Sequence, residues 1–485
     1  MTCVAKRQAT YHHSAYMETI ASLISKIDGI IWGWPLLILL MGTHLFLTIR
    51  LRFIQRYIPK AIKLSITKDE HAAGDVSQFS ALTTALAATI GTGNIVGVST
   101  AVALGGPGAV FWMWLTGVFG IATKYAESLL AVKYRVRTED GTMAGGPMYV
   151  LEYGLKQKWL AVLFALFTAI AAFGIGCMVQ ANSIASMVEK QFSIPTWITG
   201  VALMLLAGAV IVGGIKSIAR VCNKLVPFMA VFYVLGCLLI LIMTADTVPA
   251  TIMLIVKSAF TGQAATGGFA GSTVMMAMRF GVARGLFSNE SGLGSAPIVA
   301  AAAQTKNSVK QALVSSSGTF WDTVIICAMT GIVIVNSGLW NQGLDGNHLT
   351  HEAFGHLPFG IGQVILTIGL LTFVFSTILG WSYYAEKAVE YLFGKVAILP
   401  YRLVFIALIF VGAVFSLNVV WDFADLANGL MAIPNLISLL LLNGVIVRET
   451  KKYLWNDNLE SASDDPIIEI NTMKRAALSS DGEKR

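Results

Sequence analysis

Long, continuous apolar segments are the feature that most constrains how this chain of 485 residues folds. Eleven of them recur, each about as long as the roughly 20 residues that an α-helix needs to cross the hydrocarbon core of a membrane. We expect these helices at residues 30–49, 79–104, 108–132, 159–188, 196–214, 222–244, 271–303, 311–337, 361–393, 401–420 and 424–447. The segments lack the alternating pattern of membrane β-strands. The sequence therefore predicts an all-α membrane protein with 11 transmembrane helices.

The composition excludes the common soluble classes. Hydrophobic residues make up 55% of the chain and charged residues only 13%, against about 25% charged in soluble domains. A folded surface in water would need more polar side chains, so a cytosolic enzyme, a nucleic-acid-binding protein and a disordered chain are excluded. The net charge of +7 reflects basic loops rather than a nucleic-acid partner. The expected partner of the surface is the lipid bilayer.

The distribution of basic residues predicts the orientation in the membrane. With the loop 50–78 placed inside, the inner segments carry 26 of the 34 Lys and Arg residues and the outer segments 5. Basic residues mark the cytoplasmic side of membrane proteins. We therefore expect a multi-pass protein of the plasma membrane, of the bacterial inner-membrane type, with the N-terminus outside and the C-terminus in the cytoplasm. The expected divisions are an external segment 1–29, a transmembrane domain 30–447 and a solvated cytoplasmic tail 448–485, with 248–260 lying along the interface.

Two of the expected spans contain clusters of glycine. Residues 79–104 include Gly91-Thr92-Gly93-Asn94, and residues 271–303 include Gly281, Gly285, Gly292 and Gly294. Glycine inside a helix costs about 1 kcal/mol relative to alanine, so such clusters indicate deliberate breaks. These are the second and seventh spans, so each begins a unit of five helices, helices 2–6 and helices 7–11. Because five is an odd number, the two units enter the membrane in opposite orientations. Paired interrupted helices in an inverted repeat are typical of secondary transporters.

Several motifs along the chain resemble the alanine/glycine:cation symporter family. They lie at Thr83–Gly97, Gly105–Trp114, Gly145–Tyr149, Gly285–Ala296 and Gly380–Glu386. The resemblance implies a LeuT-like 5+5 inverted repeat with one extra N-terminal helix. It also implies sodium-coupled symport of small neutral amino acids, such as alanine and glycine, by alternating access. The protein would then be no enzyme, with Na⁺ as its coupling ion and no organic cofactor.

The first glycine cluster suits a zwitterionic substrate. Half-helix ends expose N–H groups for a carboxylate and carbonyl groups for an ammonium or a metal cation. Thr92, Gly93 and Asn94 are therefore candidate substrate-binding residues, although the glycines also fit a simple helix-packing face. Gln180, in the middle of the fourth span, is a further candidate for the carboxylate, or else an interhelical hydrogen bond.

The seventh span has two possible break points. We favour Phe280-Gly281-Val282-Ala283 as the source of substrate-facing carbonyl groups over Ser288-Asn289-Glu290. Charged side chains in this span need partners, because unpaired charges in hydrocarbon are costly. Candidate gate residues are Arg279, Arg284, Asn289 and Glu290, and the alternative is a structural ion pair near the inner mouth.

Hydroxyl groups in the ninth span suggest a sodium site. Thr372, Ser376, Thr377 and Trp381 form one stripe, and oxygen ligands suit a hard cation. We expect sodium at Thr89, Gly91, Thr372, Ser376 and Thr377, unless these hydroxyl groups bond only to their own helix. Trp381 is expected to line the substrate pocket and to limit the size of the side chain.

Other functions remain open from the residues alone. A proton-coupled carrier would use Asp322 or Glu290, although a structural role for Asp322 is also possible. A cation channel would use Gly91–Asn94 as its filter, but such pores are usually built from rings of repeated filters. Lys124 and Glu127 form an expected structural pair. His351 and His356 are five residues apart and diverge around a helix, so we expect no zinc site there.

Overall fold

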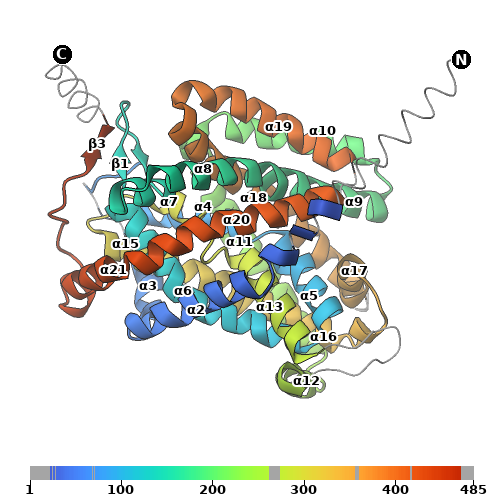
Figure 1. The fold of residues 1–485 in the computed structure, drawn as a ribbon. Helices are drawn as coiled ribbons and strands as arrows, with labels where there is room; N and C mark the ends of the chain where they lie inside the picture. The colour runs from blue at the N-terminus through green and yellow to red at the C-terminus, as the bar shows by residue number, and fades with distance from the viewer. Residues whose placement is uncertain are drawn as a thin grey trace, which may run out of the picture.

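Helices make up nearly all of the regular structure in the described part of a computed structural model of the chain (Figure 1). The structure describes residues 22–24, 26–27, 29–67, 69, 72–261, 273–355, 360–415 and 418–470. His356 and the expected start of the seventh span at residue 271 lie outside these ranges, as does most of the segment 1–29.

The long helices follow the apolar segments. They are α2 (Trp34–Arg50), α6 (Gly108–Lys133), α8 (Lys158–Phe173), α9 (Val179–Phe192), α10 (Thr196–Ile211), α11 (Gly214–Met243), α13 (Val274–Asn289), α15 (Ser308–Thr319), α18 (Ile361–Phe393), α19 (Ile398–Val414) and α20 (Asn418–Leu441). A broken span consists of α4 (Gln78–Thr89), η2 (Gly93–Gly97) and α5 (Val98–Gly105). Wide π-type turns, η4 (Gly174–Met178) and η5 (Phe320–Cys327), join α8 to α9 and α15 to α16 (Ala328–Asn336).

Shorter elements connect these helices. They are η1 (Ile54–Tyr57), α3 (Ile58–Ser65), α7 (Pro147–Tyr149), η3 (Val150–Gly154), α12 (Val248–Thr261), α14 (Pro297–Ala300), η6 (Leu339–Asn341), α17 (Gly346–Gly355), η8 (Lys395–Ala397), α21 (Asn443–Thr450) and η9 (Lys451–Trp455). A small sheet has the order β2 (Met143–Ala144), β1 (Val136–Arg137), β3 (Ile468–Glu469).

By length and composition, 6 helices of the described residues could cross a membrane, or up to 8 if each bent pair counts as one span. The bent pairs are α4 with α5, at 54°, and α20 with α21, at 59°. The helix α12 coincides with the segment 248–260 that was expected to be too short to span. The all-α membrane character is thus established, while the expected number of 11 spans stays a prediction.

The boundary between the fifth and sixth expected spans was wrong. Residues 215–221 were expected to link the spans 196–214 and 222–244, but α11 is helical from Gly214 onward. The reason is that the first turns of α11 are basic and polar, so that hydropathy marks only the apolar part of a longer helix. Lys216, Arg220 and Lys224 therefore lie on the helix itself.

The C-terminal segment is not a free tail as far as residue 470. We call Leu459–Ile470 the C-terminal strap. Its strand β3 pairs in parallel with β1. The amide of Asn307 donates to the carbonyl groups of Leu459 and Ser461, at 2.8 and 2.9 Å. The segment is therefore docked on the helical body, while residues 460–466 are exposed, and the expected solvated cytoplasmic tail stays a prediction.

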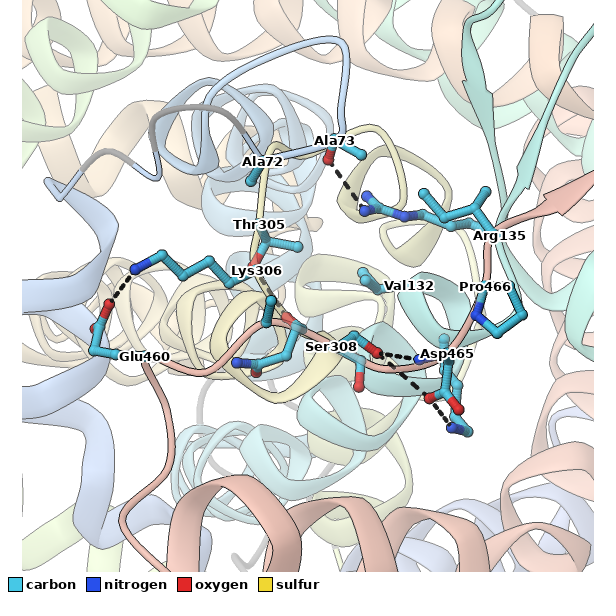
Figure 2. A pocket seen from close by; sticks show the side chains of 15 residues that line it. Ala72, Ala73, Val132, Arg135, Thr305, Lys306, Ser308, Glu460, Asp465 and Pro466 are labelled. Atoms are coloured by element: carbon cyan, nitrogen blue, oxygen red, sulfur yellow. Dashed lines mark hydrogen bonds and ion pairs between the residues drawn. The ribbon is translucent and has the colours of Figure 1, made fainter.

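Ion pairs fix the strap over a cavity of about 410 Å³ (Figure 2). Glu460 pairs with Lys306 at 2.9 Å and with Lys310 at 3.0 Å, and Asp465 pairs with Lys133 at 2.6 Å. Figure 2 shows Lys306 reaching toward Glu460 on one side of this cavity and Arg135 donating to the carbonyl group of Ala73 on another.

We expect the attachment of the strap to depend on pH. Hydrogen bonds from Lys306 and Lys310 hold the pKa of Glu460 below its ordinary value, and Lys133 does the same for Asp465. A carboxyl group whose pKa is lower in the folded state stabilises that state above its unfolded pKa of about 4, and this contribution disappears as the pH falls through the folded pKa. Protection of residues 459–470 from hydrogen exchange should be constant between about pH 7 and 5 and fall below about pH 4.

Glu460→Gln should lower this protection already at neutral pH. Glu469→Gln, which changes an exposed pair with Arg137, serves as the matched control and should change it little. Protection that is the same in Glu460→Gln and in the unaltered chain would contradict the electrostatic attachment of the strap.

Candidate functional site

The first broken span interrupts its helix where the glycine cluster predicted. The helix α4 ends at Thr89, Ile90 is extended, and helical structure resumes at Gly93 after a bend of 54°. The side chain of Asn94 accepts a hydrogen bond of 2.8 Å from the backbone N–H of Gly91. This bond satisfies one of the backbone groups that the break releases. The predicted break at Gly91–Asn94 is therefore confirmed.

The glycines of this break permit close packing by two other helices. A Cβ atom on Gly91 would lie 2.5 Å from the hydroxyl oxygen of Thr377 on α18. A Cβ atom on Gly93 would lie 3.2 Å from Phe287 and Ser288 on α13. The backbone of the break therefore contacts the end of α13 and the middle of α18 directly, with no side chain between them.

The second break lies after Asn289 and not at residues 280–283. The helix α13 is continuous through Phe280, Gly281, Val282 and Ala283, so the favoured position was wrong and these carbonyl groups are not released. Gly281 instead allows α13 to pack on α6, because a Cβ atom there would collide with the carbonyl group of Ala109.

Residues 290–296 leave the helical path before α14 begins. Glu290, Gly292 and Gly294 have positive φ values of 55°, 96° and 84°, a conformation that glycine adopts at low cost. The alternative break point at Ser288-Asn289-Glu290 is thus the correct one.

A buried carboxylate satisfies the backbone of the second break. One oxygen of Glu127 on α6 accepts from the N–H groups of Gly292, at 2.9 Å, and Gly294, at 3.1 Å. The same oxygen accepts from the amide of Asn435, at 2.6 Å. Nearby, Lys124 is buried, and its ammonium group makes no hydrogen bond to any described residue. Glu127 therefore fixes the backbone of the second break, and the expected pair of Lys124 with Glu127 was wrong, because their charged groups form no hydrogen bond with each other.

Asp322 joins the two breaks. One carboxylate oxygen accepts from the amide of Asn94 in the first break, at 2.7 Å, and the other from Ser288 beside the second break, at 2.9 Å. Thr323 donates a further hydrogen bond of 2.7 Å. Asp322 is fully buried in η5. The sequence analysis left the role of Asp322 open and named Ser288 only as part of a possible break point, so the hydrogen bond between them was not predicted.

Two of the expected sodium ligands lie at the first break. The hydroxyl group of Ser376 lies 3.2 Å from the carbonyl oxygen of Ala87, and that of Thr377 lies 3.2 Å from the carbonyl oxygen of Ile90. Both hydroxyl groups also donate to the carbonyl group of Phe373 in their own helix, at 2.8 and 3.0 Å. Oxygen atoms of α18 thus lie beside those at the end of α4, and oxygen is the ligand that a hard cation requires.

The other expected ligands are differently placed. Thr372 donates to the carbonyl groups of Ile368 and Gly369 in its own helix, and Thr89 donates to Leu86. The carbonyl groups of Ala87 and Ile90 were not among the sequence candidates, because every residue has a carbonyl group and only the geometry of the break shows which ones face α18.

Unpartnered polar atoms mark the space beside the first break. The hydroxyl group of Thr92 is buried and makes no hydrogen bond to a described residue, and the indole of Trp381 lies toward Glu290 of the second break. The side-chain oxygen of Gln180 lies 3.5 Å from the backbone nitrogen of Thr92, and its amide donates to Ile175. Trp381 packs against Gly176, where a Cβ atom would lie 2.5 Å away. Buried polar atoms without partners are rare, so this geometry suits a polar ligand.

A cavity of about 200 Å³ adjoins the break. Thr92, Gly93, Arg284, Asn347 and Asp425 are among its lining residues. Because α17 and α5 lie at the end of the molecule away from the small sheet, this cavity is on the side of the break opposite the C-terminal strap (Figure 1).

Among the candidate gate residues, Arg284 forms an ion pair with Asp425 on α20, at 3.4 Å. The guanidinium group of Arg279 lies over the ring of Phe280. The side chain of Asn289 accepts a hydrogen bond from the backbone N–H of Ser291. The carboxylate of Glu290 accepts one from the hydroxyl group of Ser295. The Arg284–Asp425 pair lines the cavity away from the strap, so the expectation of an ion pair near the inner mouth, on the side of the C-terminal tail, was wrong. Asp425 was not among the sequence candidates.

Comparisons with known proteins agree with this arrangement. The model of the sodium:alanine symporter family matches residues 17–467. The sodium/alanine symporter AgcS of Methanococcus maripaludis is 52% identical over 443 residues, which cover 89% of this chain and 97% of that protein.

Two solved structures share the fold, each with a TM-score of 0.55. One is MhsT in complex with L-phenylalanine, 15% identical, with 76% of this chain and 90% of that chain covered. The other is a Na⁺-coupled sialic acid symporter, 14% identical, with 85% and 86% covered.

The contact of α18 with α4 should tolerate no side chain at Gly380. A Cβ atom there would lie 2.6 Å from the Cβ atom of Ala88 and 2.7 Å from its backbone nitrogen. Gly380→Ala should therefore destabilise the fold by about 1–3 kcal/mol, the usual range for overpacking. Thermal unfolding of the purified chain in detergent measures the effect. Gly444→Ala is the matched control, because no atom lies within 4 Å of its Cβ position, and an equal unfolding temperature for the two variants would contradict this packing.

Proposed function

The chain belongs to the sodium:alanine symporter family, so it is an integral membrane transporter and not an enzyme; we propose that it symports Na⁺ with small neutral amino acids, with alanine and glycine as the main substrates. The observation that carries this proposal is the meeting of two helix breaks at Asp322, with four oxygens from α4 and α18 beside the first break.

We assign the coupling ion to the oxygens of Ser376 and Thr377 and to the carbonyl oxygens of Ala87 and Ile90. These groups come from two different helices, so a bound cation would hold α4 against α18. Thr372 is not included, because its hydroxyl group bonds only to carbonyl groups of its own helix, whereas Ser376 and Thr377 also contact Ala87 and Ile90.

The substrate site in this proposal lies on the other side of the same break. The backbone of Thr92 and Gly93, together with Gln180, supplies polar groups for the carboxylate, and Trp381 limits the side chain. The cavity of about 200 Å³ on the side of Thr92 and Gly93 is large enough for alanine, but Gln180 and Trp381 are not among its lining residues. Only Gly91 separates Ile90 from Thr92, so the conformation of the break is common to the ion site and the substrate site. This proximity gives a physical basis for coupling.

Alternating access would open the site toward each side in turn. The Arg284–Asp425 pair is the proposed gate on the side away from the strap, and the predicted orientation makes this the external side. The two breaks, one in each half of the chain, support the proposed inverted repeat. One sodium ion moving down about 100 mV and a tenfold gradient supplies ~3.7 kcal/mol, enough for roughly 500-fold accumulation.

Uptake of labelled alanine by proteoliposomes should require an inward sodium gradient, because the cation contributes both the driving force and part of the site. The measurement compares initial rates with sodium outside and with choline in its place. Equal rates in the two buffers would contradict sodium coupling.

A proton-coupled carrier is the second candidate, and the buried carboxylate of Asp322 between the two breaks is the observation that favours it. Uptake driven by a pH step without sodium, and abolished in Asp322→Asn, would support this alternative.

A cation channel is a third alternative. Ionic currents much larger than the turnover rate of a carrier allows would favour it.

Removal of one proposed ligand should weaken the binding of sodium more than the binding of the amino acid. In Thr377→Ala, the sodium concentration for half-maximal alanine uptake should rise about tenfold or more, as expected for loss of about 1.4 kcal/mol of binding free energy. Thr372→Ala removes the same group five residues away and should leave this concentration nearly unchanged. A sodium titration of uptake measures both, and equal shifts in the two variants would exclude the assigned ion site.

A further inference from the structure

A second, apolar cavity lies on the outside of the helix bundle. We call it the α4–α11 groove; its volume is about 480 Å³, and its walls come from α3, α4, α11 and η5. Leu82 and Leu86 on α4, Val231 on α11 and Trp321 on η5 are among the lining residues. Polar groups contribute almost nothing to these walls, so the groove offers water no partners.

The groove opens toward the hydrocarbon of the membrane. Its outer wall is the middle of α11, a helix long and apolar enough to span a bilayer. Phe228, Val231 and Leu235 on this helix are 56%, 58% and 60% exposed. An open apolar hollow at this depth is in contact with lipid chains, because the family membership places the chain in a membrane.

One end of the groove is basic. Arg220 and Lys224 are exposed on the first turns of α11, and neither forms an ion pair with a described residue. Together with Pro227 and Val231, which line the groove, they follow a spacing of three and four residues. This spacing places all four on one face of the helix. Two free positive charges therefore stand in line with the apolar hollow.

Polar side chains lie at the same end. Thr83, which lines the groove, donates to the side chain of Asn223 on α11 at 2.6 Å, and Asn223 donates to Ser80 at 2.8 Å. Along α11 the surface thus changes from basic and polar to apolar, which is the order of a lipid head group and its chain.

We propose that the α4–α11 groove binds an anionic phospholipid, with one acyl chain in the hollow and the head group on Arg220 and Lys224. An acyl chain gains little by leaving the bilayer for an equally apolar groove, since both surroundings are free of water. Selectivity therefore comes from the head group. A basic residue near an anionic surface is worth about fivefold in affinity, so the two together give about 25-fold.

The bound chain would support the half-helix α4. Ile90, at the end of α4, lines the groove, and its carbonyl group accepts from Thr377 on α18. The lipid and α18 therefore hold the same residue from two sides. The expected effect on transport rests on the proposed function, whereas the binding itself does not.

Photolabelling of the full chain in nanodiscs tests the binding. Two probes are compared at equal mole fraction, phosphatidylglycerol and phosphatidylcholine with the same diazirine-bearing acyl chain, and adducts are mapped by mass spectrometry. The phosphatidylglycerol probe should label the groove about 25-fold more than the phosphatidylcholine probe. Arg220→Gln/Lys224→Gln should reduce its labelling to the phosphatidylcholine level, whereas Lys156→Gln/Lys451→Gln, which removes two charges elsewhere, should not.

A second pair of variants tests the hollow. Val231→Trp should block labelling of the groove, whereas Leu239→Trp, at another exposed position of α11, should leave it unchanged. Equal labelling by the two probes, or adducts spread evenly over the exposed faces of α10 and α19, would overturn the proposal. Sodium-dependent uptake is measured on the same samples, so that loss of sodium coupling with retained labelling would contradict only the proposed function.

Discussion

The structure depends on satisfying the backbone groups that two interrupted helices release inside a membrane protein. In hydrocarbon these groups have no water to bond, and each unsatisfied group costs several kcal/mol. The chain solves the problem with side chains from other helices. Asn94 bonds the backbone of the first break, and Glu127 bonds two N–H groups of the second. Both breaks are therefore held by partners that must stay buried, which explains why polar side chains gather in the centre of so apolar a chain.

Asn94 and Glu127 each satisfy the backbone of one break, whereas Asp322 connects the two breaks. Its two oxygens accept from Asn94 and from Ser288, so a change at one break alters the hydrogen bonds of the other. Such a connection through one buried carboxylate is short and specific. It also restricts the chemistry of the site, because the protonation state of Asp322 and the charge of any bound cation act on the same few hydrogen bonds.

The fold class and the first break could be predicted from the sequence, since apolar length and glycine content are local properties. The second break could not be placed with the same reasoning. Gly281 and Gly292 look alike in the sequence, yet the first allows α13 to pack on α6 and the second turns the chain. Within the expected stripe on α18, the structure brings only the hydroxyl groups of Ser376 and Thr377 to the end of α4, and the sodium site stays a prediction. Pairs such as Arg284 with Asp425 join distant segments, and no local pattern identifies them.

The half-helix α4 is held at three places by three kinds of interaction. At its first residue, Gln78 donates to Asp69, and Asp69 pairs with the buried ammonium group of Lys310, which also pairs with Glu460 of the strap. Along its side, α4 packs against α11 and lines the apolar groove. At its end, Ile90 accepts from Thr377. Breaking one partner of the buried pair would leave an uncompensated charge, which is far more costly than separating apolar surfaces in lipid. A movement of α4 would therefore begin at Ile90 and the groove, and the pair of Asp69 with Lys310 would serve as its hinge.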